Sequence, residues 1–94
     1  MFIVRIEHAV RDYEAWKQVF DRDPADRKGS GVRRYQILRA SDEPNLVMID
    51  LEFDARADAD AFVRTMAGLW AGPAKAMLQG PSARVVERVE MKQV

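Results

Sequence analysis

The 94-residue sequence predicts a single α+β domain of the ferredoxin-like type, with the element order βαββαβ. Apolar residues recur with a period of two in four stretches, as in strands, and with helical spacing in two others. The chain is also too short for a second core, so we expect one domain spanning residues 1–94. Its sheet should have four antiparallel strands, with both helices covering one face.

The first half of the chain supplies a strand, a helix and a second strand. Residues 2–10 alternate apolar and polar side chains, which predicts the first strand. Asp12 is a suitable N-cap for a helix that Asp23-Pro24 ends, because the residue before a proline disfavours helical geometry. Residues 28–31 form a flexible turn, and residues 32–40 form the second strand.

The second half supplies a hairpin partner, a longer helix and a last strand. Polar residues 41–45 are predicted to connect the second strand to a third over 46–53, and a helix should follow from about Arg56 to Leu69. Gly72-Pro73 ends that helix. We expect a short turn through Leu78, closed by Gly80-Pro81, and a final strand from about Arg84 to Met91.

Right-handed crossovers place the first and third strands at the centre of the sheet, with two different faces. The helix-covered face should hold Phe2, Val4, Ile6, Val47, Ile49, Leu51 and Phe53. The opposite face should hold Ile3, Arg5, Glu7, Leu46, Met48, Asp50 and Glu52.

This second face has two interpretations. As a solvated face of a monomer it would expose Ile3, Leu46 and Met48 together, which monomers usually avoid. As the interface of a homodimer it would close a barrel, with Arg5 and the pairs Arg33/Arg34 and Arg84/Arg88 available to neutralise the carboxylates. The dimer is the favoured interpretation.

The composition excludes several classes of partner. Fifteen basic and fifteen acidic residues are interspersed, so electrostatic binding to nucleic acid or to an anionic membrane is not favoured. Cysteine is absent, which removes disulfides and thiolate chemistry and fits a reducing compartment. The chain opens with MFIVRIEH and shows no signal peptide or membrane span, so we expect a cytoplasmic protein.

Several short patterns together carry a family resemblance. They are Glu7-His8, Asp12-Tyr13-x-x-Trp16-Lys17-x-x-Phe20-Asp21-x-Asp23-Pro24, Gly31-Val32-Arg33-x-Tyr35, Asp50-Leu51-Glu52-Phe53 and Val86-x-x-Val89-Glu90. In this layout the chain resembles the dimeric α+β barrel superfamily, which includes antibiotic-biosynthesis monooxygenases, small polyketide cyclases and haem-degrading enzymes. It is most similar to the uncharacterised bacterial members. The resemblance implies the fold and a homodimer, and it covers nearly the whole chain.

His8 is the only histidine and the candidate general base. It falls near the end of the first strand, on the face that looks toward the helices. One interpretation is a half-buried histidine bonded to a neighbouring backbone group. The other is a base or hydrogen-bonding group at the mouth of a pocket between the sheet and the helices.

Six aromatic side chains are candidate walls of such a pocket. A small apolar site of this kind needs only a few polar points, which His8 and Tyr35 would supply. The same residues could equally form the core alone. They are Tyr13, Trp16, Phe20, Tyr35, Phe62 and Trp70.

The sequence lacks the residues needed for a metal site, a serine nucleophile, a haem site or a phosphate-binding loop. One histidine without cysteine gives no metal-ligand spacing, and the serines, at positions 30, 41 and 82, lie in predicted turns without a nucleophile motif. Haem-degrading relatives typically take an axial histidine from the second helical region, where this chain has none. Residues 29–31 lack the context of a phosphate-binding loop. No cofactor is therefore expected.

Two charged groups are assigned no chemistry. Asp21, Asp23 and Asp26 with Arg22, Arg27 and Lys28 form a mixed run that is expected to be a solvated surface. Glu7, Asp50 and Glu52 could handle protons, but neighbouring arginines should keep them ionised.

Three functions compete at this stage. The first is a cofactor-independent, monooxygenase-like or cyclase-like enzyme acting on a small aromatic or polyketide-like substrate. The second is a non-catalytic protein that binds a small apolar molecule. The third, an RNA-binding sheet, would need exposed aromatics on the central strands, and Arg5, Glu7, Met48 and Asp50 stand there instead.

Overall fold

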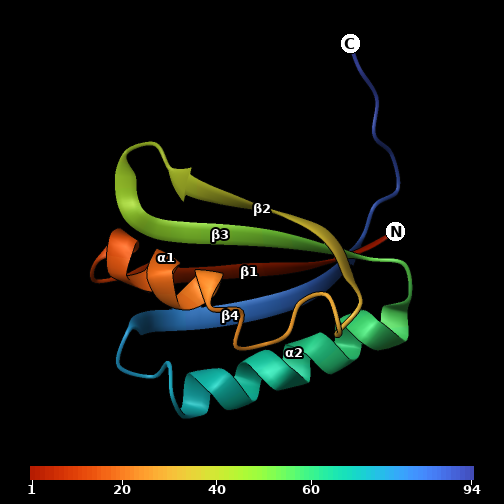
Figure 1. Ribbon diagram of the computed structural model, residues 1–94. Helices are drawn as coiled ribbons and strands as arrows, with labels where there is room; N and C mark the ends of the chain where they lie inside the picture. The colour runs from red at the N-terminus through yellow and green to blue at the C-terminus, as the bar shows by residue number, and fades with distance from the viewer.

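A computed structural model describes residues 1–94 (Figure 1). The elements are β1 (Phe2–Val10), α1 (Tyr13–Asp21), β2 (Val32–Ala40), β3 (Glu43–Phe53), α2 (Arg56–Ala71) and β4 (Leu78–Glu87). This is the predicted ferredoxin-like order βαββαβ. Neither helix has the length and apolar character needed to cross a membrane.

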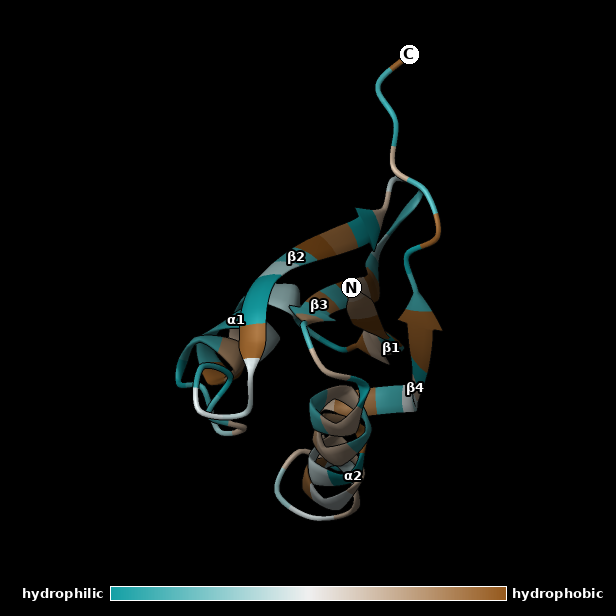
Figure 2. Ribbon diagram, turned by 90° about the vertical axis from the view of Figure 1, so that its right-hand side faces the viewer, coloured by the Kyte–Doolittle hydropathy of each residue, from teal (hydrophilic) through white to brown (hydrophobic).

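The four strands form one antiparallel sheet in the order β2-β3-β1-β4, so the first and third strands are central as predicted. Figure 2 shows both helices on the same side of this sheet. The register pairs Val4 with Leu51 and Ile6 with Ile49, which places these apolar side chains on one face. The other face of the sheet carries no helix.

The core lies between the sheet and the helices. Alternate residues of the two central strands are buried on this side, because each successive side chain of a strand points to the opposite face. At one end of the core the Phe53 and Phe62 rings pack with their centroids 5.4 Å apart. Trp16 of α1 and Ala59 of α2 complete the buried contacts of the helices.

The first helix begins where the sequence predicted. The backbone N–H of Ala15 donates a hydrogen bond to the Asp12 carboxylate over 3.3 Å, which satisfies one of the free donors of the first turn. Asp12 itself has extended backbone geometry, as an N-cap residue does.

The hairpin between β2 and β3 is tighter than predicted. The connection was expected over residues 41–45, but only Ser41 and Asp42 form the turn, and β3 begins at Glu43. The ladder extends because Ala40 pairs with Glu43 across an irregularity in the register. Polar residues at an exposed strand end resemble a loop in sequence, so the pattern alone placed this boundary too late.

The prediction for the last strand was wrong at both ends. The strand was expected over residues 84–91, but β4 spans Leu78–Glu87 and includes Gly80-Pro81, where Gly80 has a positive φ of 60° opposite a shift in register. Its end is set by its neighbour: Phe2 pairs with Glu87, and the last bond runs from the Arg88 N–H to the Met1 carbonyl. Beyond it, residues 88–94 run away from the helices (Figures 1 and 2).

The segment between α1 and β2 is held by its own hydrogen bonds. Asp23 accepts a bond from the backbone N–H of Arg27, Asp26 accepts one from Gly29, and the Ser30 hydroxyl donates to the Ala25 carbonyl over 2.8 Å. The segment ends at Gly31, whose φ of 96° favours glycine. A Cβ at Gly31 would lie 2.9 Å from a carboxylate oxygen of Asp58 in the first turn of α2.

We therefore expect Gly31→Ala to lower the free energy of unfolding by about 1–2 kcal/mol, because alanine is strained at this φ. Gly68→Ala is the matched control. Gly68 lies in α2 with no atom near its would-be Cβ, so alanine should raise stability by about 0.5–1 kcal/mol. Urea unfolding of the three proteins measures both effects, and a Gly31→Ala variant as stable as the parent would contradict the strain at this turn.

Candidate functional site

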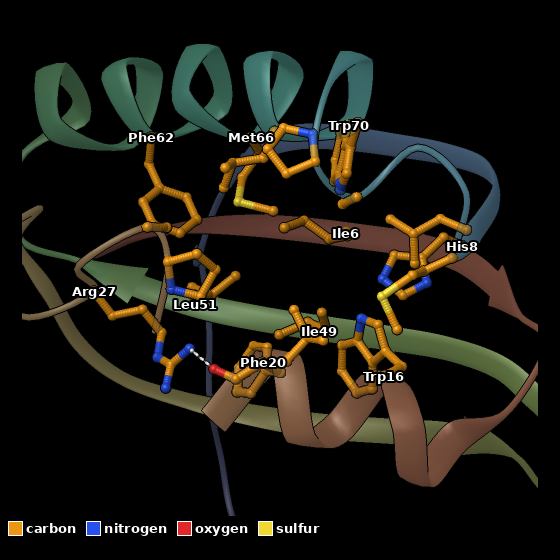
Figure 3. Close-up of a pocket in the computed structure, with 18 residues that line it drawn as sticks. Ile6, His8, Trp16, Phe20, Arg27, Ile49, Leu51, Phe62, Met66 and Trp70 are labelled. Atoms are coloured by element: carbon orange, nitrogen blue, oxygen red, sulfur yellow. Dashed lines mark hydrogen bonds between the residues drawn. The ribbon is translucent and has the colours of Figure 1, made fainter. Parts of the chain in front are cut away.

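A largely apolar pocket lies between the sheet and the two helices, with a volume of about 120 Å³ (Figure 3). Its floor comes from β1 and β3, and its two walls come from α1 with the following loop and from α2 between Phe62 and Trp70. The turn after α2 closes one end. The lining residues are Ile6, His8, Trp16, Val19, Phe20, Pro24, Ala25, Arg27, Ile49, Leu51, Phe62, Met66, Leu69, Trp70, Pro73, Ala74, Met77 and Leu78.

His8 is the most deeply placed polar group of this pocket. The residue is only 2% exposed, and its ring packs edge-on against the Trp16 ring, with the centroids 5.3 Å apart. Burial lowers the pKa of His8 to about 4, because the apolar surroundings disfavour the charged imidazolium. The imidazole is therefore neutral at pH 7 and offers one hydrogen-bond acceptor and one donor.

The Nδ1 atom of His8 is buried and has no hydrogen-bond partner in the chain. One interpretation of the sequence expected the imidazole to bond to a neighbouring backbone group. Nδ1 does not form that bond. An unpaired buried polar atom typically costs about 1–3 kcal/mol. His8 belongs to the pocket wall, and a bound molecule would reach Nδ1 by displacing the side chains that cover this atom.

The structure brings together four of the six aromatic side chains proposed for the pocket: Trp16, Phe20, Phe62 and Trp70. The other two lie just outside it. Tyr13 packs on Trp16 at 5.7 Å, and Tyr35 on the edge strand is exposed and meets Phe20 edge-on at 5.2 Å. Tyr35 lies on the helix-covered face of the sheet, opposite Leu51, but Phe20 stands between its ring and the pocket.

Arg27 is a lining residue that the sequence interpretation missed. It was assigned to a solvated mixed-charge run, but its side chain is only 15% exposed and is the one charged group of the pocket lining. Its guanidinium lies 4.0 Å from the Phe20 ring and 4.9 Å from the Tyr35 ring. Arg27 is buried because its loop folds back over the end of α1, where the guanidinium bonds to the Phe20 carbonyl. No spacing of residues in the sequence predicts this fold of the loop.

The face of the sheet without helices holds the seven residues proposed for a dimer interface. Arg5 pairs with Asp50 through two hydrogen bonds of 2.8 and 3.0 Å, and Glu52 accepts from both Arg34 and Arg88. The bond from Arg5 is the main reason that the pKa of Asp50 is lowered, and the bond from Arg34 does the same for Glu52.

These ion pairs change the account of the open face. Asp50 and Glu52 are neutralised within their own chain, so their charge alone does not require a partner subunit. Ile3, expected to be exposed in a monomer, is only 8% exposed. The carboxylates stay ionised, which does not suit them to donate protons. No group of three or more histidine, aspartate or glutamate side chains is placed to hold a metal ion.

The amino-acid sequence of the chain matches no protein-family model and no curated protein. Its structure matches SnoaB, a cofactor-independent oxygenase from Streptomyces nogalater, with a TM-score of 0.76 and 15% identity, covering 96% of this chain and 94% of that one. A Deinococcus radiodurans protein assigned as an antibiotic biosynthesis monooxygenase matches with a TM-score of 0.74 and 12% identity, over 100% of this chain and 98% of its own.

The structural neighbours are antibiotic biosynthesis monooxygenase-like proteins of the ferredoxin-like fold. At these identities the likeness shows the fold alone. Another neighbour, a protein of unknown function from Nitrosomonas europaea, matches with a TM-score of 0.70 and 15% identity, over 99% of this chain and 93% of its own. The fold named from the sequence is thereby confirmed.

The buried His8 predicts a pH dependence of stability. Its folded pKa, about 4, lies below its ordinary value of 6.5, so the unfolded chain binds more protons between these values. Stability should therefore fall as the pH falls, by about 2 kcal/mol between pH 7 and pH 5. Urea unfolding at several pH values measures this, and His8→Asn should flatten the profile over that range. An equally steep profile in His8→Asn would show that another group titrates.

Proposed function

We propose that the protein is a cofactor-independent enzyme of the monooxygenase or cyclase type that acts on a small aromatic substrate in the His8 pocket. The observation that carries this proposal is a neutral imidazole with an unpaired, buried Nδ1 in the wall of an apolar pocket. The fold is compatible with such chemistry, since one structural neighbour is a cofactor-independent oxygenase.

The environment of His8 determines what kind of base it is. A lone imidazolium is disfavoured in this pocket, which is why the pKa of His8 is low. Proton transfer from a bound substrate would create the imidazolium and the substrate anion together, and their attraction in a low-dielectric site offsets the cost. The proposed role is therefore to deprotonate an acidic C–H or O–H group that lies against the imidazole, with a geometry fixed by the aromatic wall.

An oxygenation of this kind needs no external reductant. His8 removes a proton from a substrate CH₂ group, and the resulting carbanion adds O₂ to give a peroxide. Loss of the second C–H proton and of hydroxide from that peroxide leaves a carbonyl group and water. The electrons come from the substrate, so the step balances with O₂ as the only co-reactant.

The size of the pocket limits the substrate. An apolar cavity of about 150 Å³ is known to hold a benzene molecule, and this pocket is of the same order. One aromatic ring would fill the enclosed space. A polyketide-like substrate with further rings would have to extend beyond the enclosed space.

The second candidate is a protein that binds the same class of molecule without turnover. The low pKa of His8 is the observation that favours it, because a weak base serves well as a hydrogen-bond acceptor. Both candidates use the same pocket, and they differ in whether a proton leaves the ligand.

His8→Asn separates the two functions, because asparagine can accept a hydrogen bond near the Nδ1 position but cannot serve as a base. With anthrone as the probe, in which an acidic CH₂ lies between two aromatic rings, we expect oxygen uptake to fall by about 10²-fold or more. An oxygen electrode measures turnover. The fluorescence of Trp16 and Trp70, which are the only two tryptophans and both line the pocket, reports binding.

Retained binding with lost turnover supports the enzyme. Binding of anthrone without oxygen uptake by the parent protein would favour the non-catalytic candidate. Tyr13→Phe is the control, since Tyr13 packs behind Trp16 and lies outside the pocket. It should leave both readouts unchanged.

We further propose that two copies pair through the open sheet face, as the resemblance to dimeric α+β barrels implies. Leu38 on this face is 42% exposed, beside the half-buried Met48 of the neighbouring strand. The segment 88–94 adds Val89 and Met91, which alternate with charged residues and are 91% and 69% exposed. Such alternation is typical of a strand with one buried face, and a second copy would supply that face.

Leu38→Asp should convert the dimer to a monomer, because a carboxylate would be buried against the partner without a cation. Light scattering at low micromolar concentration measures the mass. Thr65→Asp, which adds the same charge to an exposed position of α2, should leave the dimer intact. A parent protein that has the mass of one chain would refute the dimer.

A further inference from the structure

We propose that Arg27 makes the pocket selective for aromatic acids, with the carboxylate of the ligand bound at the guanidinium and the ring system extending toward His8. The inference rests on the proposed ligand pocket and adds the chemical class of its occupant. It concerns binding and holds for either the enzyme or the non-catalytic protein.

Arg27 stands at one end of the pocket and His8 at the other (Figure 3). The rest of the lining is apolar, apart from the indole N–H donors of Trp16 and Trp70, so Arg27 and His8 are its only ionisable groups. One of them is cationic, and the other is neutral at pH 7. An occupant that satisfies both is anionic at the Arg27 end, apolar in its body, and able to donate a hydrogen bond at the His8 end.

The guanidinium has donors to spare. Nη1 donates to the Phe20 carbonyl over 2.8 Å and lies 3.4 Å from Asp23, which is a loose contact with a half-exposed carboxylate. A guanidinium carries five N–H groups in a planar fork that matches a carboxylate. One hydrogen bond and one loose ion contact, both made by Nη1, leave the rest of that fork free, and none of its nitrogens is buried without a partner. The free donors are thus accessible.

The position of Arg27 is fixed before any ligand arrives. Its backbone N–H is bound to Asp23 at 2.9 Å, and its carbonyl accepts a bond from Val32 at 3.0 Å. Its guanidinium is stacked against the Phe20 and Tyr35 rings. A side chain held in this way loses little freedom on binding, which favours affinity.

The charge around Arg27 also favours an anion. A second, more open hollow on the surface shares Arg27 with the pocket and is lined by Lys28, Arg33 and Arg34 as well as Asp23. Arg33 and Arg34 are paired with Asp54 and Glu52, and Lys28 has no ion pair. Arg27 therefore stands where the apolar pocket meets a surface on which Lys28 has no ion pair, and the positive charge of Lys28 would attract a carboxylate.

The test compares benzoate, whose single ring fits the enclosed space, with benzamide, which has the same shape and no charge. Binding is followed by the fluorescence of the two pocket tryptophans. We expect the parent protein to bind the acid at least about tenfold more tightly than the amide. Arg27→Met should remove that preference and leave the affinity for the amide unchanged, and Arg27→Lys should retain part of it. Arg39→Met is the control, because this variant removes the same charge from a residue that stacks on Tyr13 outside the pocket.

The affinities of the parent protein for the acid and the amide distinguish the role of Arg27 from the existence of the pocket. Equal affinities of the parent protein for acid and amide would overturn the role of Arg27 and leave the pocket standing. No binding of either compound would overturn the pocket and the inference with it. Because the comparison of acid with amide uses the unaltered protein, it stays decisive even if Arg27→Met does not fold.

Discussion

The alternation of side chains along β1 is the constraint on which the rest of the site depends. The strand is central and pairs on both edges, so its register cannot slip without turning every apolar residue to the wrong face. Val4 and Ile6 fix the even-numbered positions against the helices, and His8 must follow them. A histidine is thus carried into the core by its neighbours, and its low pKa and unpaired Nδ1 are consequences of that placement.

The pocket exists because the helices pack unevenly over the sheet. In α2 the buried residues, Ala59 and Phe62, lie in its first half, where Phe62 packs on the Phe53 ring and forms the boundary between the core and the pocket. In the second half Met66, Leu69 and Trp70 are only half-buried, because the cavity lies beneath them. On the opposite wall, Trp16 is the single buried residue of α1. One end of the layer is therefore packed as a core and the other is left as a site.

Sequence patterns anticipated those features that depend on local periodicity. The strand order, both helices, the inward orientation of His8 and four of the aromatic lining residues all follow from period and crossover rules. Features set by contacts distant in sequence were missed. The end of β4 is determined by the start of β1, and Gly80-Pro81, which reads as a turn, is accommodated within a strand by an irregular register.

Arg27 illustrates the same limit at the level of chemistry. In the sequence it stands among six charged residues between Asp21 and Lys28, a composition typical of solvent-exposed surface. Its burial depends on the hydrogen bonds of its loop and on the aromatic rings of α1 and β2, and none of these relations has a fixed spacing.

The two faces of the sheet handle charge in opposite ways. On the open face arginines meet carboxylates within one chain, so the charges are already neutralised and the surface is left with apolar groups beside satisfied ion pairs. That arrangement suits a contact between proteins, because pairs formed in advance do not have to be built during association. On the covered face the cation of Arg27 has only a loose ion contact, and the Nδ1 atom of His8 is unpaired. Incomplete pairing in an apolar pocket favours a ligand that completes it, and this difference, more than the fold, is the reason we propose the helix-covered face for the recognition of small molecules.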